Sequence, residues 1–406
     1  MKNENWNNRI GLCRFTISCF IFKKYEVIGY DIDRARIHQL QEYIDEKNEI
    51  TTERLEKSKI LFTNNLNELK SCNIYIITVP TPIDKYNKPD ITLLKNASKI
   101  VSGLLKKDDI IIYESTVYPG ATEEDCIPIL EQNSGLIFNK DFFVGYSPER
   151  INVGDKNHPI EKIKKIVSGS TKEIAYKINE LYSSVLENGT YIASSIKVAE
   201  ASKVIENCQR DVNIAFMNEM KIILDTLDIN SREVFRAAKT RWNWADFYPG
   251  LVGGHCISVD PYYLISKAEE KNLHTSILPL ARKINNEMSI YVVEYVIKEI
   301  IIKKLNMNEL NVLILGITFK PDCNDLRNSK VVDVYNQLKT YNINDIDVYD
   351  DIANPAEVKS MYNINIIKNI KQEKNYSVII KLVNHTSFSS FDYKAFLKKD
   401  GIYYEL

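Results

Sequence analysis

At 406 residues the chain is too long for one ordinary hydrophobic core, so two or three domains are expected. A formal net charge of −1 excludes the basic field that nucleic-acid binding needs. The seven cysteines have no CxxC pair or zinc-finger spacing, which argues against a disulfide framework and predicts no metal site. Because no run of about 18 apolar residues is present, the chain is expected in the cytoplasm, with no membrane partner.

From Tyr25 onward, short β-branched runs alternate with helical patterns, which is typical of a parallel sheet covered by helices on both faces. The predicted strands are 26–33, 59–64, 73–82, 109–116, one strand in each half of 137–171, and 190–194. The predicted helices are 34–46, 93–105 and 172–187. This alternation predicts a doubly wound α/β domain in the first half of the chain.

Asp31 stands at the end of the 26–33 strand, where a dinucleotide fold places a carboxylate for the ribose; an ordinary turn aspartate is the alternative. The preceding strand and glycine-rich turn read IGLCRFTISCFIF, in which only Gly11 remains and Cys13 and Arg14 replace small residues. Permissible codons for residues 5–22, shifted by one base, encode IGIIGLGYVGLPLAVLF. We therefore hypothesise a local frameshift or a sequencing artefact there, which resequencing would decide. As written, the stretch would weaken cofactor binding.

A helix of about 30 residues is predicted from Ser195 to Leu227, and helices this long usually bridge domains. Lys203 and Asn207 are four residues apart on one face of it and could point together into a cleft. A surface lysine beside a core asparagine is the alternative. Glu149 and Arg150 follow a strand in the first domain, where a solvated charge pair is the alternative to a functional one.

A glycine-rich stretch, PGLVGGHCISVDPYYL (249–264), surrounds Cys256. Gly250, Gly253 and Gly254 would let a loop fold tightly enough to present the thiol, and Asp260 follows closely. The alternative is a buried structural cysteine beside a turn.

After a helix at about 276–304, a second α/β unit begins with NVLILGITFKPDCNDLRNS (311–329). Further strands are predicted at 345–350 and 376–383, and Lys320 and Arg327 are candidate anion contacts. The fold class expected is therefore α/β, with two Rossmann-like doubly wound domains joined by a long central helix. The predicted domain limits are 1–194, 195–290 and 291–406.

Several segments together resemble the UDP-glucose/GDP-mannose dehydrogenase family. They are VPTP (79–82), YSPERIN (146–152), the helix segment 194–219, and 249–264 followed by GITFKPDCNDLRNS. The resemblance covers nearly everything from Tyr25 onward and is similar in detail to UDP-N-acetylglucosamine and UDP-N-acetylgalactosamine 6-dehydrogenases of capsule or O-antigen synthesis. It implies an NAD-dependent, four-electron oxidation of C6 of a UDP-N-acetylhexosamine to the uronic acid.

The resemblance also implies roles for individual residues. Cys256 matches the nucleophile that passes through a thiohemiacetal and a thioester. Lys203 and Asn207 match the groups that stabilise the oxyanion, and Asp260 matches the carboxylate that positions a water molecule. Glu149 matches the acid/base residue, and Thr116 matches the threonine that holds the same water.

Binding residues follow from the same resemblance. The residues implied for NAD are Gly11, Asp31, Arg36, Val79, Pro80, Thr81, Thr116 and Arg327. Those implied for the UDP-sugar are Glu149, Arg150, Lys203, Asn207, Tyr248, Gly253 and Lys320, and residues 242–248 are expected to wrap it. A homodimer through the long helix is implied as well. The alternatives are UDP-glucose or UDP-N-acetylmannosamine as substrate, or a catalytically impaired homologue that only binds a sugar nucleotide.

Overall fold

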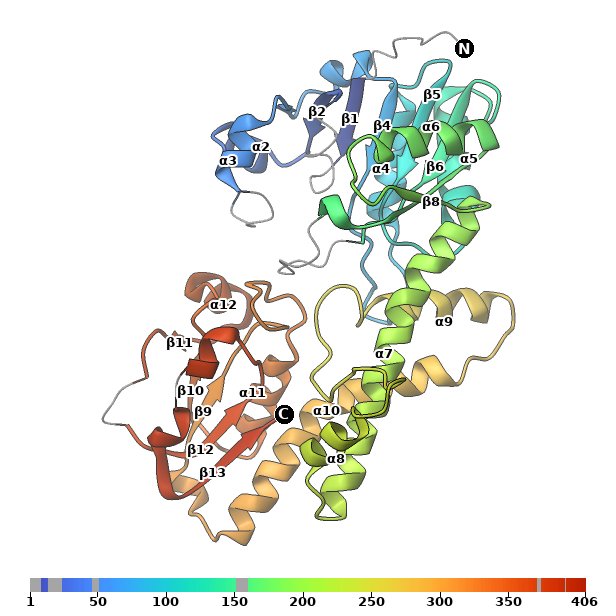
Figure 1. Ribbon diagram of the computed structural model, residues 1–406. Helices are drawn as coiled ribbons and strands as arrows, with labels where there is room; N and C mark the ends of the chain where they lie inside the picture. The colour runs from blue at the N-terminus through green and yellow to red at the C-terminus, as the bar shows by residue number, and fades with distance from the viewer. Residues whose placement is uncertain (1–8, 14–23, 46–50, 151–159, 371–373, 391) are drawn as a thin grey trace. The chain divides into compact units, whose positions relative to one another are not determined.

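The computed structural model describes residues 9–13, 24–45, 51–150, 160–370, 374–390 and 392–406 (Figure 1). The chain divides into two compact units: unit 1 is Met1–Glu206 with Tyr262–Asn272, and unit 2 is Asn207–Pro261 with Leu273–Leu406. The division falls inside the long helix α7 (Ile196–Thr226), which contributes residues to both units. The predicted pair of Rossmann-like domains joined by a long central helix is thus confirmed, whereas the predicted limits at 194/195 and 290/291 stay predictions.

Unit 1 contains an eight-stranded sheet in the order β3-β2-β1-β4-β5-β6-β7-β8, and its neighbouring strands are parallel except for β6 and β7. The strands are β1 (Arg9–Cys13), β2 (Glu26–Tyr30), β3 (Leu61–Thr63), β4 (Ile74–Ile77), β5 (Asp109–Tyr113), β6 (Phe142–Tyr146), β7 (Lys165–Gly169) and β8 (Thr190–Ile192). The strand order reverses between β1 and β4, which is the kind of point where doubly wound sheets bind ligands.

The strand expected before 26–33 is present as β1. Gly11 lies within it, paired with Ile28 of β2 and Tyr75 of β4, and not in the turn that follows. Arg14 and most of the aberrant stretch 5–22 lie outside the described residues. The frameshift hypothesis for that stretch therefore stays a hypothesis.

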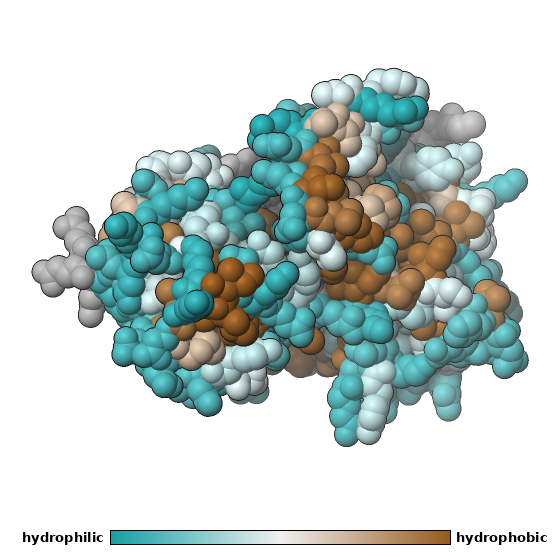
Figure 2. Space-filling view, turned by 90° about the horizontal axis from the view of Figure 1, so that it is seen from below, coloured by the Kyte–Doolittle hydropathy of each residue, from teal (hydrophilic) through white to brown (hydrophobic). Residues whose placement is uncertain are grey.

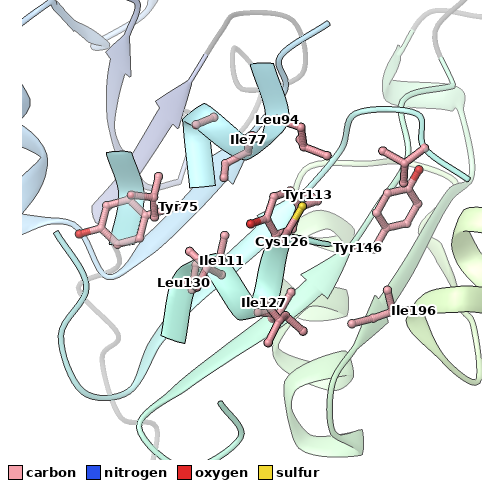
Figure 3. Close-up of a cluster of buried hydrophobic side chains, with 14 of the residues drawn as sticks. Tyr75, Ile77, Leu94, Ile111, Tyr113, Cys126, Ile127, Leu130, Tyr146 and Ile196 are labelled. Carbon is pink, nitrogen blue, oxygen red and sulfur yellow. The ribbon is translucent and has the colours of Figure 1, made fainter. Parts of the chain in front are cut away.

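Both faces of the unit 1 sheet are buried. Consecutive residues of β4 belong to different clusters, since Tyr75 and Ile77 pack in one and Ile74 and Ile76 in the other. Helices α4 (Thr92–Ser102) and α5 (Ile127–Ser134) cover the first face, and α2 (Arg34–Gln41), α3 (Thr52–Lys57) and α6 (Lys172–Ser183) cover the second. Figure 3 shows the first cluster. The continuous apolar runs in these strands follow from this two-sided burial.

Unit 2 contains a five-stranded parallel sheet in the order β11-β10-β9-β12-β13. The strands are β9 (Asn311–Leu315), β10 (Asp345–Tyr349), β11 (Ile366–Ile367), β12 (Tyr376–Lys381) and β13 (Leu397–Glu405). The helices are the second half of α7, α8 (Ser231–Ala238), α10 (Ile277–Ile302), α11 (Lys330–Thr340) and α12 (Pro355–Tyr362). Helices α10, α11 and α12 share one cluster with the sheet, so they cover the same face.

Asp350 fixes the carboxyl-end loops of the unit 2 sheet. Its carboxylate accepts hydrogen bonds from the backbone N–H groups of Ile317 (2.7 Å) and Ala353 (2.8 Å). Nε2 of the buried His385 lies 3.1 Å from Asp350 Oδ2, and Nδ1 of His385 accepts the N–H of Asp322 at 3.0 Å. Because Nδ1 is an acceptor, Nε2 carries the proton and donates to Asp350. Burial alone would raise the pKa of Asp350, but the hydrogen bonds from His385 and the backbone outweigh it and lower that pKa below 3.8.

We predict that Asp350→Asn lowers the free energy of unfolding of unit 2 by about 2–4 kcal/mol at neutral pH, because a buried charged acceptor is lost. A carboxyl with a lowered pKa stabilises the fold above its unfolded pKa, and this stability is lost as the pH falls through the folded value. The difference from wild type should therefore shrink below pH 3.8. Urea unfolding followed by circular dichroism measures both effects. The exposed neighbour supplies the control: Asp351→Asn should change stability by less than about 0.5 kcal/mol, and equal losses in the two variants would contradict the prediction.

Candidate active site

Cys256 lies in a turn that leads directly into helix α9 (Asp260–Glu270). Its carbonyl oxygen accepts hydrogen bonds from the N–H groups of Val259 (3.1 Å) and Asp260 (2.8 Å). The cysteine is exposed, whereas Cys72, Cys126, Cys208 and Cys323 are all buried. The alternative of a buried structural cysteine at 256 is therefore excluded.

Two of the three glycines before Cys256 are required by close packing. A Cβ on Gly253 would lie 2.5 Å from the carbonyl oxygen of Asn328, and one on Gly254 would lie 2.7 Å from the ring of Phe319. Gly254 also has a φ of +81°, which glycine adopts without strain. A Cβ on Gly250 would meet nothing within 4 Å, so close packing does not require glycine at position 250. The cysteine loop thus packs against the loop that follows β9.

Asn207 and Asp260 are joined by a hydrogen bond. Asn207 Nδ2 donates to Asp260 Oδ2 at 2.5 Å, and both side chains are buried. Lys203 precedes Asn207 by one turn of α7 and is also buried, at 9% exposure. The alternative of a surface lysine at this position is therefore wrong. The structure brings two of the predicted catalytic residues, Asn207 and Asp260, into contact and places Lys203 on the same face of α7 as Asn207.

Thr116 and Glu149 follow β5 and β6, two neighbouring strands of the unit 1 sheet. The N–H of Glu149 donates to the carbonyl of Glu114 at 3.3 Å, and its partly buried carboxylate accepts the N–H of Arg150 at 2.7 Å. The Thr81 hydroxyl donates to the carbonyl of Thr116 at 2.6 Å. The loops after β4, β5 and β6 therefore meet at the carboxyl end of this sheet.

A buried ionic cluster supports the Glu149 loop, and sequence reasoning missed it. The Lys165 ammonium lies 3.4 Å from the Glu114 carboxylate and donates to the carbonyls of Ser147 and Pro148, each at 3.0 Å. The Tyr182 hydroxyl donates to the same carboxylate. Burial raises the pKa of Glu114, and the nearby Lys165 opposes that rise. The sequence signal that could have revealed this cluster is a lysine, Lys165, at the first position of the otherwise uncharged strand KIVSG.

The predicted anion contacts already have protein partners. Arg150 pairs with Glu206 at 2.5 Å and donates to the carbonyl of Lys164. Arg327 is exposed and pairs with Asp325 at 2.5 Å, and the Lys320 ammonium lies 5.3 Å from the centre of the Phe319 ring. The half-exposed Tyr248 accepts a hydrogen bond from Lys239 at 3.0 Å. Substrate or cofactor roles for Arg150, Lys320, Arg327 and Tyr248 stay predictions.

A cavity of about 620 Å³ lies at the carboxyl ends of β2 and β4, the two neighbours of β1. Its lining includes residues predicted to bind a dinucleotide, namely Asp31, Arg36, Val79 and Pro80. The Asp31 carboxylate is held by the N–H of Asp33 at 2.9 Å. Arg36 pairs with Asp45 at 2.6 Å. An acidic acceptor at a strand end beside apolar walls suits the adenosine half of a dinucleotide.

Two further searches concern only the part of the chain that the structure describes. Among those residues, no cluster of three or more His, Cys, Asp or Glu side chains is arranged to hold a metal ion. None of their helices is long and apolar enough to span a membrane.

Known proteins match the chain along almost its whole length. Residues 10–186 match the NAD binding domain of the UDP-glucose/GDP-mannose dehydrogenase family, 197–287 its central domain and 313–403 its UDP binding domain. The chain is 49% identical to a UDP-N-acetyl-D-glucosamine 6-dehydrogenase of Pseudomonas aeruginosa, over 91% of this chain and 87% of that protein. It is 47% identical to Protein CapL of Staphylococcus aureus, over 98% and 94%. The solved UDP-D-ManNAc dehydrogenase of Pyrococcus horikoshii superposes with a TM-score of 0.87 at 25% identity and covers 98% of both chains.

We predict that Asp31→Ala weakens NAD⁺ binding by about 10-fold or more, because the ribose hydroxyls lose a charged acceptor worth about 1.5–3 kcal/mol. Isothermal titration calorimetry measures the dissociation constant. Asp33→Ser is the matched control: it alters a second acid of the same cavity but keeps the N-cap of α2, so affinity should change by less than about twofold. Equal weakening by both substitutions would count against a ribose contact at Asp31.

Proposed function

Because this chain belongs to the UDP-glucose/GDP-mannose dehydrogenase family, we propose that it oxidises C6 of a UDP-N-acetylhexosamine to the uronic acid. The family makes it an NAD-dependent nucleotide-sugar dehydrogenase, and its 49% identity to a UDP-N-acetyl-D-glucosamine 6-dehydrogenase supports the choice of sugar. The observation that carries the mechanism is the exposed Cys256 on its glycine loop, next to the bonded pair of Asn207 and Asp260. By the sequence resemblance, the product serves capsule or O-antigen synthesis.

The proposed chemistry explains why a cysteine is needed. Converting an alcohol to an acid removes two hydrides, and NAD⁺ bound at the cavity beside Asp31 would supply the hydride acceptor for each oxidation. The Cys256 thiolate adds to the C6 aldehyde and forms a thiohemiacetal, whose oxidation gives a thioester. Water then cleaves the C–S bond, which releases the carboxylate and returns the thiol. The balance is one alcohol, two NAD⁺ and one water to one acid, two NADH and the released protons.

Lys203, Asn207 and Asp260 surround this step in the proposal. The Lys203 ammonium and the Asn207 amide stabilise the oxyanion that develops when the thiolate adds. One amide hydrogen of Asn207 is held by Asp260, which fixes the orientation of the amide and leaves its second hydrogen for the oxyanion. The Asp260 carboxylate positions the hydrolytic water. Glu149 acts as acid and base in forming and cleaving the thioester, and Thr116 holds the same water.

The proposed cofactor contacts centre on Asp31, whose charge favours NAD⁺ over NADP⁺ because it would repel a 2′-phosphate. Arg36, Val79 and Pro80 line the same cavity. Gly11, Thr81, Thr116 and Arg327 complete the set proposed for the cofactor. For the sugar nucleotide, Glu149, Arg150, Lys203, Asn207, Tyr248, Gly253 and Lys320 remain the proposed contacts. Asp325 already accepts hydrogen bonds from Nε and Nη2 of Arg327, so an anion at this guanidinium would share it with a carboxylate.

The long helix supports a homodimer. Val198, Ile205, Phe216 and Ile223 are about half exposed on α7, and their spacings of 7, 11 and 7 residues place them on one side of the helix. Figure 2, which views the molecule from below, shows brown hydrophobic patches among hydrophilic side chains. A row of exposed apolar side chains along a long helix is suited to a second copy of the same helix. We therefore place the dimer contact on this row.

One observation favours a second candidate, a catalytically impaired homologue that binds a sugar nucleotide. Gly11 lies inside β1, and the sequence after β1 begins with Arg14 in place of the small residues that a pyrophosphate turn needs. Under this alternative, the purified protein binds a UDP-sugar in a calorimeter but neither binds NAD⁺ nor forms NADH.

The leading proposal predicts that NADH formation is fastest with a UDP-N-acetylhexosamine of the gluco or galacto configuration. Initial rates should be measured at 340 nm with UDP-N-acetylglucosamine, UDP-glucose and UDP-N-acetylmannosamine as substrates. About two NADH should form for each sugar consumed, because both oxidations take place on one enzyme. A higher kcat/KM with UDP-glucose or UDP-N-acetylmannosamine would contradict the proposed substrate class.

We further predict that Cys256→Ser lowers uronic acid formation by at least about 1,000-fold, because the poorer nucleophile cannot carry the thioester. Product is measured by mass spectrometry after a fixed time. The buried Cys72 offers a control outside the proposed site, and Cys72→Ala should keep kcat within about threefold of wild type. Undiminished uronic acid production by Cys256→Ser would rule out covalent catalysis by this residue.

A further inference from the structure

We propose that Asn218, with the buried pair of Asp211 and Arg282, is a positioning residue that fixes the loop carrying Cys256. This inference rests on the proposed role of Cys256 as nucleophile. Asn218 is fully buried on α7 and bonds to both backbone groups of Gly250: its Nδ2 donates to the carbonyl at 3.0 Å, and its Oδ1 accepts the N–H at 2.8 Å. The Asn218 amide therefore holds the backbone of Gly250, at the beginning of the cysteine loop, through both its N–H and its carbonyl group.

These hydrogen bonds continue into a network between α7 and α10. Asn218 Nδ2 also donates to Asn285 Oδ1 at 2.9 Å, and Asn285 Nδ2 donates to the carboxylate and the carbonyl of Asp211 at 2.7 and 2.9 Å. Arg282 pairs with Asp211 at 2.6 Å and reaches the carbonyl of Ile257, the residue after the cysteine, at 3.4 Å. One connected set of buried polar groups therefore touches the loop on both sides of Cys256.

A third anchor comes from the same side of α7. Asn207, Asp211 and Asn218 are separated by four and seven residues, which places them on one face of the helix. Asn207 holds Asp260, so the face has attachment points at residues 250, 257 and 260. Residues 244–253 have no helix or strand of their own, so side-chain attachments such as that of Asn218 to Gly250, together with the packing of Gly253, help to define their path.

Fixing this path matters for the proposed reaction. A thiolate must approach the aldehyde carbon within a narrow range of distance and angle, and a misplacement of about 1 Å can cost about 100-fold in rate. An exposed cysteine on an unanchored loop would sample many positions. The buried network limits that sampling and leaves the thiol itself exposed.

The same two helices supply a matched control. Asp225 on α7 bonds to Lys221 at 2.8 Å and to the hydroxyl of Tyr291 on α10 at 2.5 Å. Asp225 lies seven residues beyond Asn218, on the same face of the helix. Tyr291→Phe therefore removes a polar contact between α7 and α10 without removing a bond to the cysteine loop.

The test compares Asn218→Ala with Tyr291→Phe in the full chain. Asn218→Ala should lower kcat by about 10-fold or more, because the loop that carries Cys256 is displaced. Hydrogen–deuterium exchange at residues 249–258 should be faster in Asn218→Ala than in wild type. Tyr291→Phe should leave kcat and this exchange unchanged. Equal loss of kcat in both variants, or unchanged exchange in Asn218→Ala, would overturn the inference.

If Asn218→Ala does not fold, hydrogen–deuterium exchange of the wild-type protein tests the inference instead. The Gly250 amide should then be protected as strongly as the amides of α7, and rapid exchange at Gly250 would overturn the inference. The exchange measurement needs no substrate, so it separates this inference from the proposed function. Faster loop exchange with an unchanged kcat would show that Asn218 holds the loop but would overturn its role in positioning Cys256 for the reaction.

Discussion

The buried ion pair between Asp211 and Arg282 is the constraint on which much of unit 2 depends. Removing a charge pair from water is costly unless hydrogen bonds compensate for it. Here Asn285, Asn286 and the Ile257 carbonyl supply such bonds, whereas Asp211 Oδ2 and Arg282 Nε have no hydrogen-bond partner among the described residues. These bonds join α7 to α10. Burial raises the pKa of Asp211, and the adjacent guanidinium opposes that rise. The same pair contacts the cysteine loop through the Ile257 carbonyl.

Unit 1 uses a comparable device under a different loop. Lys165 and Glu114 are both buried, and Lys165 holds the two carbonyls that precede Glu149. In both units, a buried ionic group binds backbone carbonyls next to a residue proposed to take part in the chemistry. Each proposed reactive group can therefore stay accessible while the backbone beneath it is rigid.

Periodicity was enough to predict most of the secondary structure, because buried parallel strands are continuous apolar runs and α7 has a long helical pattern. The predicted helix at 195–227 is observed as Ile196–Thr226. Helix α9 was missed, although an aspartate followed by proline at Asp260 is a typical helix start. The partners of Asn218 and Arg282 could not be predicted, since contacts between polar residues some 70 positions apart leave no local pattern. The site residues came from motif resemblance and not from periodicity.

Helix α9 makes the first unit discontinuous in sequence. Residues 262–272 belong to unit 1, and the hydroxyl of Tyr263 donates to the carbonyl of Thr81, next to the loop that contains Thr116. During synthesis the sheet of unit 1 emerges from the ribosome long before this helix does. The hydrogen bond between Tyr263 and the Thr81 carbonyl can form only after residues 249–263, which include Cys256, have been synthesised. During synthesis, unit 1 can therefore complete its fold only after the Cys256 loop of unit 2 has been translated.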